Sequence, residues 1–389
     1  MKKVVSAVLG LLLNVCLSGF AIANLTFATA QESHSSSPLR IAFFSPGHQQ
    51  SDNPTGQFWP ESSRFAAAVA EKLGIELDVH YADRDYLKMQ QQISKLLRGS
   101  DRPDYLLLVN ERFALTPQIH DINQSEVPFF LAYNHLQKPG SKSLLTPRSD
   151  YKNWIGSLIP DNRYAGYALA KHLINQVQSK PPRILVLAGN NITSSAVLRE
   201  HGLALALQQH PNAQIRERIV GNWGFAEPRR KITGILHRHP DINMIWSANG
   251  PMALGALEGL LASENNHSAL TVGSINWDPE ELVAIESGQL SVSFGGHFMT
   301  AGLSLILIND YHHGIDFKND GGIYQQRQLF YPASAQVIKR HPILKNRQWD
   351  QIDFRRMSKH HNPKLDKYDF RLESLLDTAT FNGADAVNK

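Results

Sequence analysis

Asn249 occupies a position where a polar side chain can meet a small molecule. It follows an apolar, strand-like stretch, INMIWSA (242–248), and precedes Gly250-Pro251 and an amphipathic helical pattern, MALGALEGLLA (252–262). Proline favours the first turn of a helix, and open α/β sheets bind ligands beside the carboxyl ends of their strands. Asn249 is therefore a candidate ligand residue. Because Asn is also a favoured N-cap, capping of the helix alone is the alternative.

Other residue types that could do chemistry do not form a recognised catalytic or metal-binding pattern. The 17 histidines include His312-His313, His360-His361 and His237 with His239. Adjacent histidines on a helix point apart, whereas zinc needs ligands that converge. The chain has no G-x-S-x-G, P-loop or H-E-x-x-H motif, and Ala188-Gly189-Asn190-Asn191 lacks the rest of a dinucleotide fingerprint. We therefore expect no catalytic residue, no cofactor and no metal.

The elements around Asn249 follow a repeated strand–helix pattern. Most of the strand-like runs are continuously apolar, which is typical of a parallel sheet covered on both faces by helices. The first half contains RIAFF (40–44), ELDVHYA (76–82), YLLLVN (105–110) and VPFFLAY (127–133), with helical patterns at 61–73 and 86–98. After a polar stretch (137–153), the second half contains RILVLAG (183–189), QIRERIV (214–220), INMIWSA and LTVGSIN (270–276), with helical patterns at 194–209 and 227–239. The pattern predicts two doubly wound units whose carboxyl edges face a common cleft.

The amino terminus has the features of a secretory signal. Lys2 and Lys3 precede an apolar run (4–27) and the small-residue sequence Ala28-Thr29-Ala30, so we expect a signal peptide at 1–30. The single cysteine, Cys16, lies inside it, and loss of the leader lowers the formal charge from +4 to +2. This near-balanced charge predicts no nucleic-acid partner. We expect an exported, periplasmic protein without disulfides in its mature form.

Several segments together resemble the type I periplasmic binding proteins, especially the ribose, allose and galactose binders of ABC transporters. The resemblance covers roughly 40–315 and rests on an ordered set of segments: Phe58-Trp59, 71–74, 108–110, Pro160-Asp161-Asn162, 195–202, His239-Pro240-Asp241, Ala248-Asn249, 252–257 and Val272-Gly273. LacI-type repressors share the fold but begin with a helix-turn-helix, where this chain has a signal-like segment. The resemblance implies two Rossmann-like lobes joined by a hinge. We place the first lobe at 38–157 plus 297–322, the second at 158–296 plus 323–345, and a charged carboxyl-terminal extension at 346–389.

The resemblance also assigns candidate ligand residues. It places the aromatic rings of Phe58 and Trp59 on the first lobe and of Trp223 on the second, where they clamp the ligand; the alternative for each ring is core packing. A sugar offers apolar C–H faces to such rings, and its hydroxyls need planar polar partners. The polar contacts are expected from Asn110 and Asn249, which follow buried strands, and from Arg199, to which the resemblance gives a hydroxyl-binding role; the alternative for Arg199 is a surface position on its helix. Asn276 and Trp277 end the last strand of the second unit, and we expect them to line the same cleft.

The chain departs from the usual sugar-site pattern at three places. Tyr133-Asn134 stands where an Asp-Arg pair is common, Gly250 replaces a common acidic residue, and Gly296-His297 replaces a usual Gln or Asn. We include Tyr133, Asn134 and His297 among the candidate ligand residues. Since charged acceptors make the strongest hydrogen bonds to hydroxyls, their loss argues against an ordinary monosaccharide site. A modified sugar, a polyol-like signal or a ligand with its own carboxylate for Arg199 all remain possible.

The function that we favour is capture of a small polar ligand and its delivery to the membrane permease of an ABC transporter. The ligand class that we favour is a sugar or sugar derivative. The alternative is a sensory co-receptor, similar to the periplasmic autoinducer-2 receptor, that presents its closed form to a membrane sensor protein. In both cases we expect a monomer that closes on its ligand by hinge motion. The extension after Lys345 is either a tail packed on the second lobe or a docking surface for a membrane partner.

Overall fold

The structure is a computed structural model that describes residues 37–138, 140, 143–177, 180–262 and 270–376 of the 389-residue chain. The expected signal peptide therefore lies outside the described residues, and so do residues 377–389 of the extension. Within the described ranges, no helix combines the length and the apolar character needed to cross a membrane.

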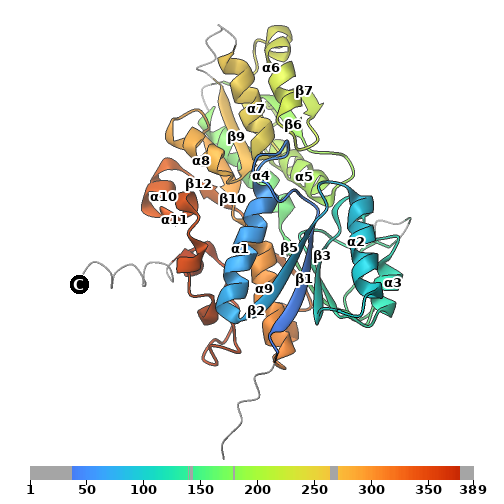
Figure 1. Cartoon of the computed structure of the whole chain (residues 1–389). Coiled ribbons are helices and arrows are strands. Elements are labelled where there is room, and N and C mark those ends of the chain that lie inside the picture. The colour runs from blue at the N-terminus through green and yellow to red at the C-terminus, as the bar shows by residue number, and fades with distance from the viewer. Residues whose placement is uncertain (1–36, 139, 141–142, 178–179, 263–269, 377–389) are drawn as a thin grey trace, which may run out of the picture. The chain divides into compact units, whose positions relative to one another are not determined.

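The first lobe contains a six-stranded parallel sheet in the order β11-β5-β4-β3-β1-β2 (Figure 1). Its strands are β1 (Leu39–Ser45), β2 (Ile75–Tyr81), β3 (Tyr105–Val109), β4 (Phe129–Ala132), β5 (Trp154–Pro160) and β11 (Tyr324–Arg327). Helices α1 (Phe58–Leu73) and α9 (Thr300–His312) pack together, with α9 against β3, β4 and β5, while α2 (Tyr86–Arg98) packs on β1 and β2 and α3 (Ile119–Gln124) follows β3. Both faces of β1 are buried, as its continuous apolar sequence predicts.

The second lobe repeats this architecture in the order β12-β10-β9-β8-β6-β7, in which only β12 is antiparallel to its neighbour. The strands are β6 (Arg183–Ala188), β7 (Gln214–Val220), β8 (Met244–Ser247), β9 (Thr271–Asn276), β10 (Val292–Gly295) and β12 (Tyr331–Ala333). The helices are α4 (Asn162–Gln176), α5 (Ser194–Gln208), α6 (Ala226–Arg238), α7 (Gly250–Leu261) and α8 (Pro279–Glu286). Two doubly wound parallel-sheet lobes confirm the predicted fold class.

Two close helix pairs hold the second lobe together. Helices α4 and α5 approach closely at Gly166 and Gly202: a Cβ atom on Gly166 would lie 1.9 Å from the Arg199 carbonyl oxygen, and one on Gly202 would lie 2.1 Å from that of Arg163. Helices α6 and α7 form the second pair. The glycines on α4 and α5 thus fix the position of Arg199 at the end of the lobe that faces the cleft.

The sheets divide the chain differently from the expected lobe ranges. Strand β5 continues to Pro160 in the first sheet, so the first crossing falls after residue 160 and not after 157. Strand β11 pairs in parallel with β5, which places 324–327 in the first lobe, whereas we had expected 323–345 in the second. The chain then crosses to β12 in the second sheet. The helix predicted at 61–73 begins at Phe58, because the Gln57 carbonyl oxygen accepts the Glu61 N–H at 2.9 Å.

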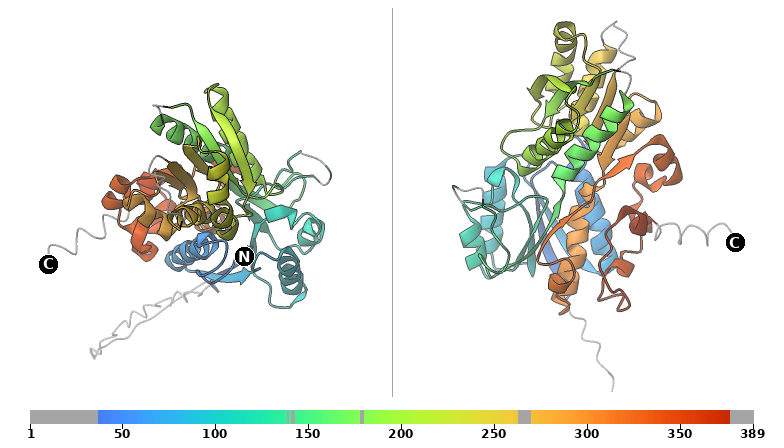
Figure 2. Two further views of the ribbon diagram at one scale, coloured as in Figure 1. Left: turned by 90° about the horizontal axis from the view of Figure 1, so that it is seen from above. Right: turned by 180° about the vertical axis from the view of Figure 1, so that it is seen from behind.

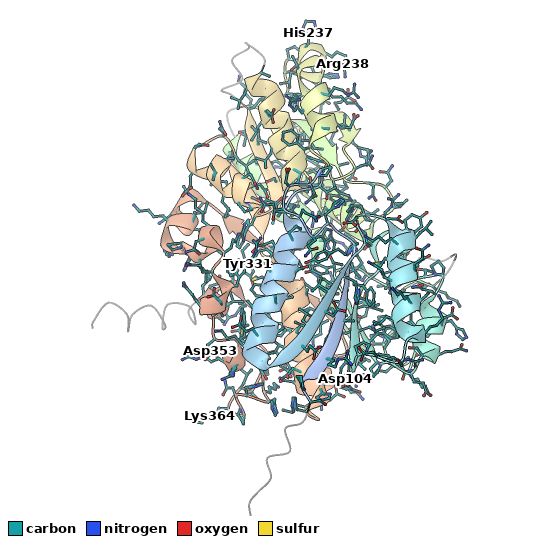
Figure 3. The ribbon with its side chains drawn as sticks, viewed as in Figure 1. Asp104, His237, Arg238, Tyr331, Asp353 and Lys364 are labelled. Atoms are coloured by element: carbon teal, nitrogen blue, oxygen red, sulfur yellow. The ribbon has the colours of Figure 1, made fainter. Side chains whose placement is uncertain are left out.

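The chain after β12 crosses between the lobes once more. Helix α10 (Ala335–Arg340) contacts α8, and α11 (Ile343–Asn346) follows; the 3₁₀ turns η4 (Trp349–Gln351) and η5 (Phe354–Met357) then pack against α1 of the first lobe. Opposite views show this segment beside α1 and α9 (Figures 1 and 2), and Asp353 and Lys364 lie along the same side (Figure 3). The described part of the extension is therefore packed on the first lobe, whereas one of the two alternatives drawn from the sequence placed it on the second.

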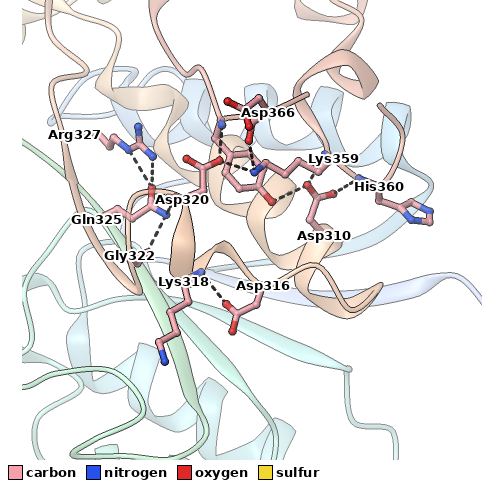
Figure 4. Close-up of polar contacts among 11 residues, drawn as sticks. Asp310, Asp316, Lys318, Asp320, Gly322, Gln325, Arg327, Lys359, His360 and Asp366 are labelled. Atoms are coloured by element: carbon pink, nitrogen blue, oxygen red, sulfur yellow. Dashed lines mark hydrogen bonds and ion pairs between the residues drawn. The ribbon is translucent and has the colours of Figure 1, made fainter. Parts of the chain in front are cut away.

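Buried polar contacts anchor this extension to α9 (Figure 4). The carboxylate of Asp310, at the end of the buried part of α9, accepts hydrogen bonds from the backbone N–H groups of Lys359 at 2.6 Å and His360 at 3.2 Å. It also accepts one from the Tyr368 hydroxyl at 2.9 Å. Lys359 forms an ion pair with Asp320 at 2.8 Å. A buried carboxylate with this many donors fixes the extension to one place on the lobe.

Candidate ligand-binding site

A cavity lies between the carboxyl ends of the two sheets. Its lining residues come from both lobes: Thr55, Phe58, Trp59, Arg84, Glu111, Tyr133, Asn134, Pro160, Asn162, Ser195, Arg199, Trp223, Asn249, Asn276 and His297. Many of these residues lie at the end of a strand or within a few residues after it, such as Tyr133 directly after β4 and Asn249 two residues after β8. This is the edge at which doubly wound sheets bind ligands. Nine of the eleven predicted site residues line the cavity.

The first lobe contributes a cluster of aromatic rings. Phe58 and Trp59 form the first turn of α1, and their ring centroids lie 5.0 Å apart in an edge-to-face arrangement. Tyr133 is 5.1 Å from Trp59 in the same manner. The Tyr133 hydroxyl donates to the Phe298 carbonyl oxygen at 2.8 Å and accepts the Ala301 N–H at 3.1 Å, so mainly its ring serves the cavity. Phe58 and Trp59 thus lie on α1 itself, ahead of the helical pattern that the sequence predicted at 61–73.

The second lobe contributes Trp223 from the loop between β7 and α6. The backbone of Trp223 is left-handed, with φ at +68°, which is uncommon for a bulky residue. Its ring packs on Gly189, where a Cβ atom would lie 2.5 Å from the ring. The indole Nε1–H is buried and has no hydrogen-bond partner among the described residues. Trp223 therefore presents both an aromatic face and a free donor to the cavity region.

Arg199 on α5 is the most deeply buried charge that lines the cavity. Its Nε donates to Asn162 Oδ1 at 2.9 Å, Nη1 donates to the Ala248 carbonyl oxygen at 2.6 Å, and Nη2 donates to His297 Nε2 at 2.9 Å. Burial lowers the pKa of the guanidinium to about 9, so the group stays charged at neutral pH. Its carbon lies 5.7 Å from the centroid of the Trp223 ring. The network orients the guanidinium toward the site.

His297 begins the segment that returns to the first lobe after β10. Because Arg199 can only donate, the hydrogen bond between them makes His297 Nε2 an acceptor and leaves the proton on Nδ1. Burial, reinforced by the positive charge of Arg199, holds the pKa of His297 well below its usual range. The imidazole is therefore neutral, and its buried Nδ1–H has no partner among the described residues. The ring also packs on Phe58, with centroids 4.6 Å apart.

Sequence reasoning missed a charged pair in the cavity wall. Arg84, after β2, donates through Nη1 and Nη2 to the two oxygens of Glu111, after β3, at 2.7 and 2.6 Å. We had inferred that the site lacks a charged acceptor, and Glu111 corrects this inference. The sequence did offer a signal for Glu111, because this residue directly follows the apolar run YLLLVN. We chose Asn110, the last residue of that run, and not its neighbour Glu111. Asn162 and Ser195 were also missed, although both lie in segments that carried the resemblance.

The asparagines of the site have different roles. Asn249 caps α7 through its Oδ1, which accepts the Met252 N–H at 3.1 Å, and its Nδ2 donates to the Trp223 carbonyl oxygen at 2.9 Å. Asn249 thus has both of the roles that the sequence allowed. It caps the helix and holds the Trp223 loop, and it also lines the cavity. Asn134 donates to the Ser194 hydroxyl at 3.1 Å across the lobes.

Two predicted residues do not line the cavity. Asn110 donates to the His135 carbonyl oxygen at 2.8 Å and accepts the Leu115 N–H at 3.1 Å, so its side chain holds the loop after β3. Trp277 is buried, and its Nε1 donates to the Ser293 carbonyl oxygen at 2.8 Å. Both follow strands that end at the cavity, but their side chains turn into the lobes. Position after a strand indicates the right edge of the sheet but not which neighbour faces the ligand.

The lobes also touch around the cavity. The Phe225 N–H donates to the Pro54 carbonyl oxygen at 3.4 Å, and Gln57 of the first lobe donates to Glu280 of the second. With the bond between Asn134 and Ser194, these contacts join loops of both lobes around the site. In the described part of the chain, no group of three or more His, Cys, Asp or Glu residues is arranged to hold a metal ion.

The two doubly wound lobes and the cavity between them define a two-lobed binding protein. Residues 51–298 match the family model of the periplasmic binding protein domain, and the chain belongs to this family, whose members bind solutes and are not enzymes.

Among known proteins, the chain is similar to the D-apiose import binding protein of Paraburkholderia graminis, with 25% identity over 63% of this chain and 72% of that protein. It is also similar to the galactofuranose-binding protein of Escherichia coli, with 23% identity over 66% of this chain and 76% of that protein. A solved periplasmic sugar-binding protein from Pseudomonas fluorescens has 33% identity and a TM-score of 0.77, covering 87% of this chain and 99% of that one.

Proposed function

We propose that this protein captures one monosaccharide or monosaccharide derivative in the interlobe cavity and delivers it to an ABC importer in the membrane. The observation that carries the proposal is the pairing of aromatic rings with planar polar groups in one cavity. Phe58 and Trp59 from the first lobe and Trp223 from the second suit the C–H faces of a sugar, and Arg199 and Asn162 suit the oxygen atoms at its edge.

The size of the cavity supports a small ligand. The space open to the centre of a water molecule is about 70 Å³. One water needs roughly 10–15 Å³ on this measure, so the cavity has room for several waters or for one small molecule in their place.

The named relatives support import over sensing. The relative from Paraburkholderia graminis is named for D-apiose import, and the one from Escherichia coli is named for galactofuranose binding. We infer that the segment at 1–30 directs export to the periplasm and is then removed, as expected from Lys2, Lys3 and the apolar run that follows.

A substitution of Trp223 tests the proposed function. We expect Trp223→Ala to abolish ligand binding while the melting temperature of the empty protein stays within a few degrees, because Trp223 lies at the cavity wall. The measurement is a thermal-shift screen of residues 31–389 against sugars and sugar derivatives. A ligand at a hundred times its dissociation constant stabilises the wild type by about 2.7 kcal/mol.

The control is Leu261→Ala, since Leu261 is 70% exposed at the end of α7 and should bind like the wild type. A large loss of stability in the empty Trp223→Ala protein would make Trp223 a core residue. If no sugar or sugar derivative raises the melting temperature of the wild type, the proposed function is contradicted.

A further inference from the structure

The charges that line the cavity do not cancel. Arg84, Glu111 and Arg199 are the lining side chains that carry charge, and His297 is neutral. The two carboxylate oxygens of Glu111 are both engaged by Arg84. Arg199 is left as the uncompensated charge, so the empty cavity has a net positive charge.

Arg199 has no carboxylate within ion-pair distance among the described residues. Its three protein partners are an amide oxygen, a carbonyl oxygen and the neutral imidazole of His297. Glu281 acts on Arg199 only at longer range, and its own oxygens accept from Ser274, Ser293 and the backbone N–H of Asp278. A buried charge is costly unless it is paired, so this guanidinium calls for an anionic partner from outside the chain.

The free polar atoms near Arg199 are also donors. His297 Nδ1–H and Trp223 Nε1–H are both buried and lack a partner in the described ranges. His297 is bonded to Arg199, and Trp223 lies under its guanidinium. A hydroxyl group both donates and accepts, whereas a carboxylate only accepts. A cluster of three donor groups, one of them cationic, therefore matches a carboxylate better than a hydroxyl.

We propose that the ligand is a sugar acid, a monosaccharide whose carboxylate is bound by Arg199 with the N–H groups of His297 and Trp223. This inference rests on the proposed function, because it places the rest of the ligand against the aromatic rings of Phe58 and Trp59. The size of the cavity and these rings select against a small inorganic anion, which has no apolar face.

Ligands that share a sugar ring but differ in charge separate the contribution of the carboxylate to binding from that of the ring. Titration calorimetry would compare galactose, galacturonate and the methyl ester of galacturonate, together with the glucose and arabinose series, including the aldonates. We expect at least one uronate or aldonate to bind 100-fold or more tightly than its neutral parent. We also expect its methyl ester to lose most of that gain, because the ester keeps the shape and removes the charge.

The two proposals fail in different ways. A neutral sugar that binds as tightly as every acid tested would overturn the sugar-acid inference and leave the proposed function intact. Absence of binding by all sugars and all sugar acids would overturn both. Equal binding of an acid and its ester would also overturn the inference, since it would show that charge does not select the ligand.

Two variants test the donors directly. Trp223→Phe keeps an aromatic ring but removes the Nε1–H together with part of the indole surface. The lost surface weakens the acid and its ester alike, so we expect the acid to lose about tenfold more affinity than the ester. Arg199→Lys keeps the charge but loses the planar fork, and we expect a loss of 30-fold or more for the acid. The matched control is Arg229→Gln, an exposed arginine on α6 paired with Glu258, which should bind as the wild type does. If Trp223→Phe weakens the acid and the ester equally, the indole N–H does not contact the carboxylate.

Discussion

At the scale of single residues, the site combines groups whose protonation states depend on each other. Arg199 is charged and donates to His297, and the same charge together with burial keeps His297 neutral. The arrangement fixes which nitrogen of His297 is free to donate. It also makes the folded protein sensitive to acid, because an unfolded histidine takes up a proton at a higher pH than His297 does in the fold.

We predict that His297→Gln reduces the acid sensitivity of stability. With a folded pKa well below the unfolded value of about 6.5, wild-type His297 contributes no pH dependence above pH 7 and loses stability as the pH falls. A histidine that stays neutral in the fold lowers the free energy of unfolding by about 2 kcal/mol between pH 7 and pH 5, because only the unfolded state takes up the proton. Urea unfolding of wild type and variant at both pH values measures the difference.

The buried carboxyls of Asp278 and Glu281 act in the opposite direction, because burial raises the pKa of each and acid favours their folded form. They are present in both proteins, so their contribution cancels in the comparison. Equal pH dependence in the two proteins would mean that folding leaves the pKa of His297 unchanged, which would contradict an imidazole kept neutral by burial and by Arg199.

The outcome for individual site residues shows what sequence patterns can resolve. Asn249, just after β8, and Asn276, the last residue of β9, were identified because the ends of these strands meet at one edge of the sheet, and both line the cavity. The same logic selected Asn110, although its neighbour Glu111 lines the cavity, because a 3₁₀ turn directly after β3 rotates successive side chains. Arg84 and Glu111 form their pair across two separate loops, and no local pattern in one sequence reports such a contact.

At the scale of elements, α9 depends on the carboxyl-terminal extension. Residues 300–310 are buried all around the helix, so the apolar sequence LSLILI needs cover on every side. The sheet and α1 contact α9, and Ser358 to Tyr368 supply the polar contacts of Asp310 on this helix. The extension is therefore part of the fold of the first lobe.

We predict that Asp310→Ala lowers the free energy of unfolding by on the order of 3 kcal/mol, because it leaves two backbone N–H groups and the Tyr368 hydroxyl without their acceptor in a buried place. Denaturant unfolding measures the loss, and limited proteolysis should cut the extension faster. Asp121→Ala, an exposed aspartate on α3, is the control. A variant as stable as this control would show that the extension is held by its apolar contacts alone.

The regular elements were more predictable than their connections. The limits of β7 and α2 agree with the sequence patterns at 214–220 and 86–98. Strand β5 was not identified, because Gly156, Ser157 and Pro160 interrupt its apolar run. The packing of the extension was also missed, because Trp349, Phe354 and Tyr368 are spread through a charged sequence without helical or strand periodicity, and only the partner surface on α1 and α9 shows why they are buried.

At the scale of the whole described chain, the extension adds a connection between the lobes beyond those that follow β5, β10 and β11. Arg347 lies where it crosses. Its Nη2 donates to the Trp277 carbonyl oxygen in the second lobe, and its Nε lies 3.9 Å from Glu61 in the first. Arg347 is buried and has a left-handed backbone with φ at +58°. A hinge motion that separates the lobes has to break one of these contacts.

We predict that Arg347→Ala favours the open form. Loss of a buried hydrogen bond to a charged group changes the balance by roughly 1.5–3 kcal/mol, which is about ten- to a hundredfold in the ratio of closed to open protein. Small-angle scattering of the empty protein should report a larger radius of gyration, and ligand affinity should fall by about tenfold, because binding then has to supply the closure that Arg347 no longer supports. Arg355→Ala is the matched control, since Arg355 also lies in the extension but donates to the Lys72 carbonyl oxygen within the first lobe at 2.8 Å. If the two variants scatter and bind alike, Arg347 anchors the extension without restraining the lobes, and closure depends on the contacts around the cavity alone.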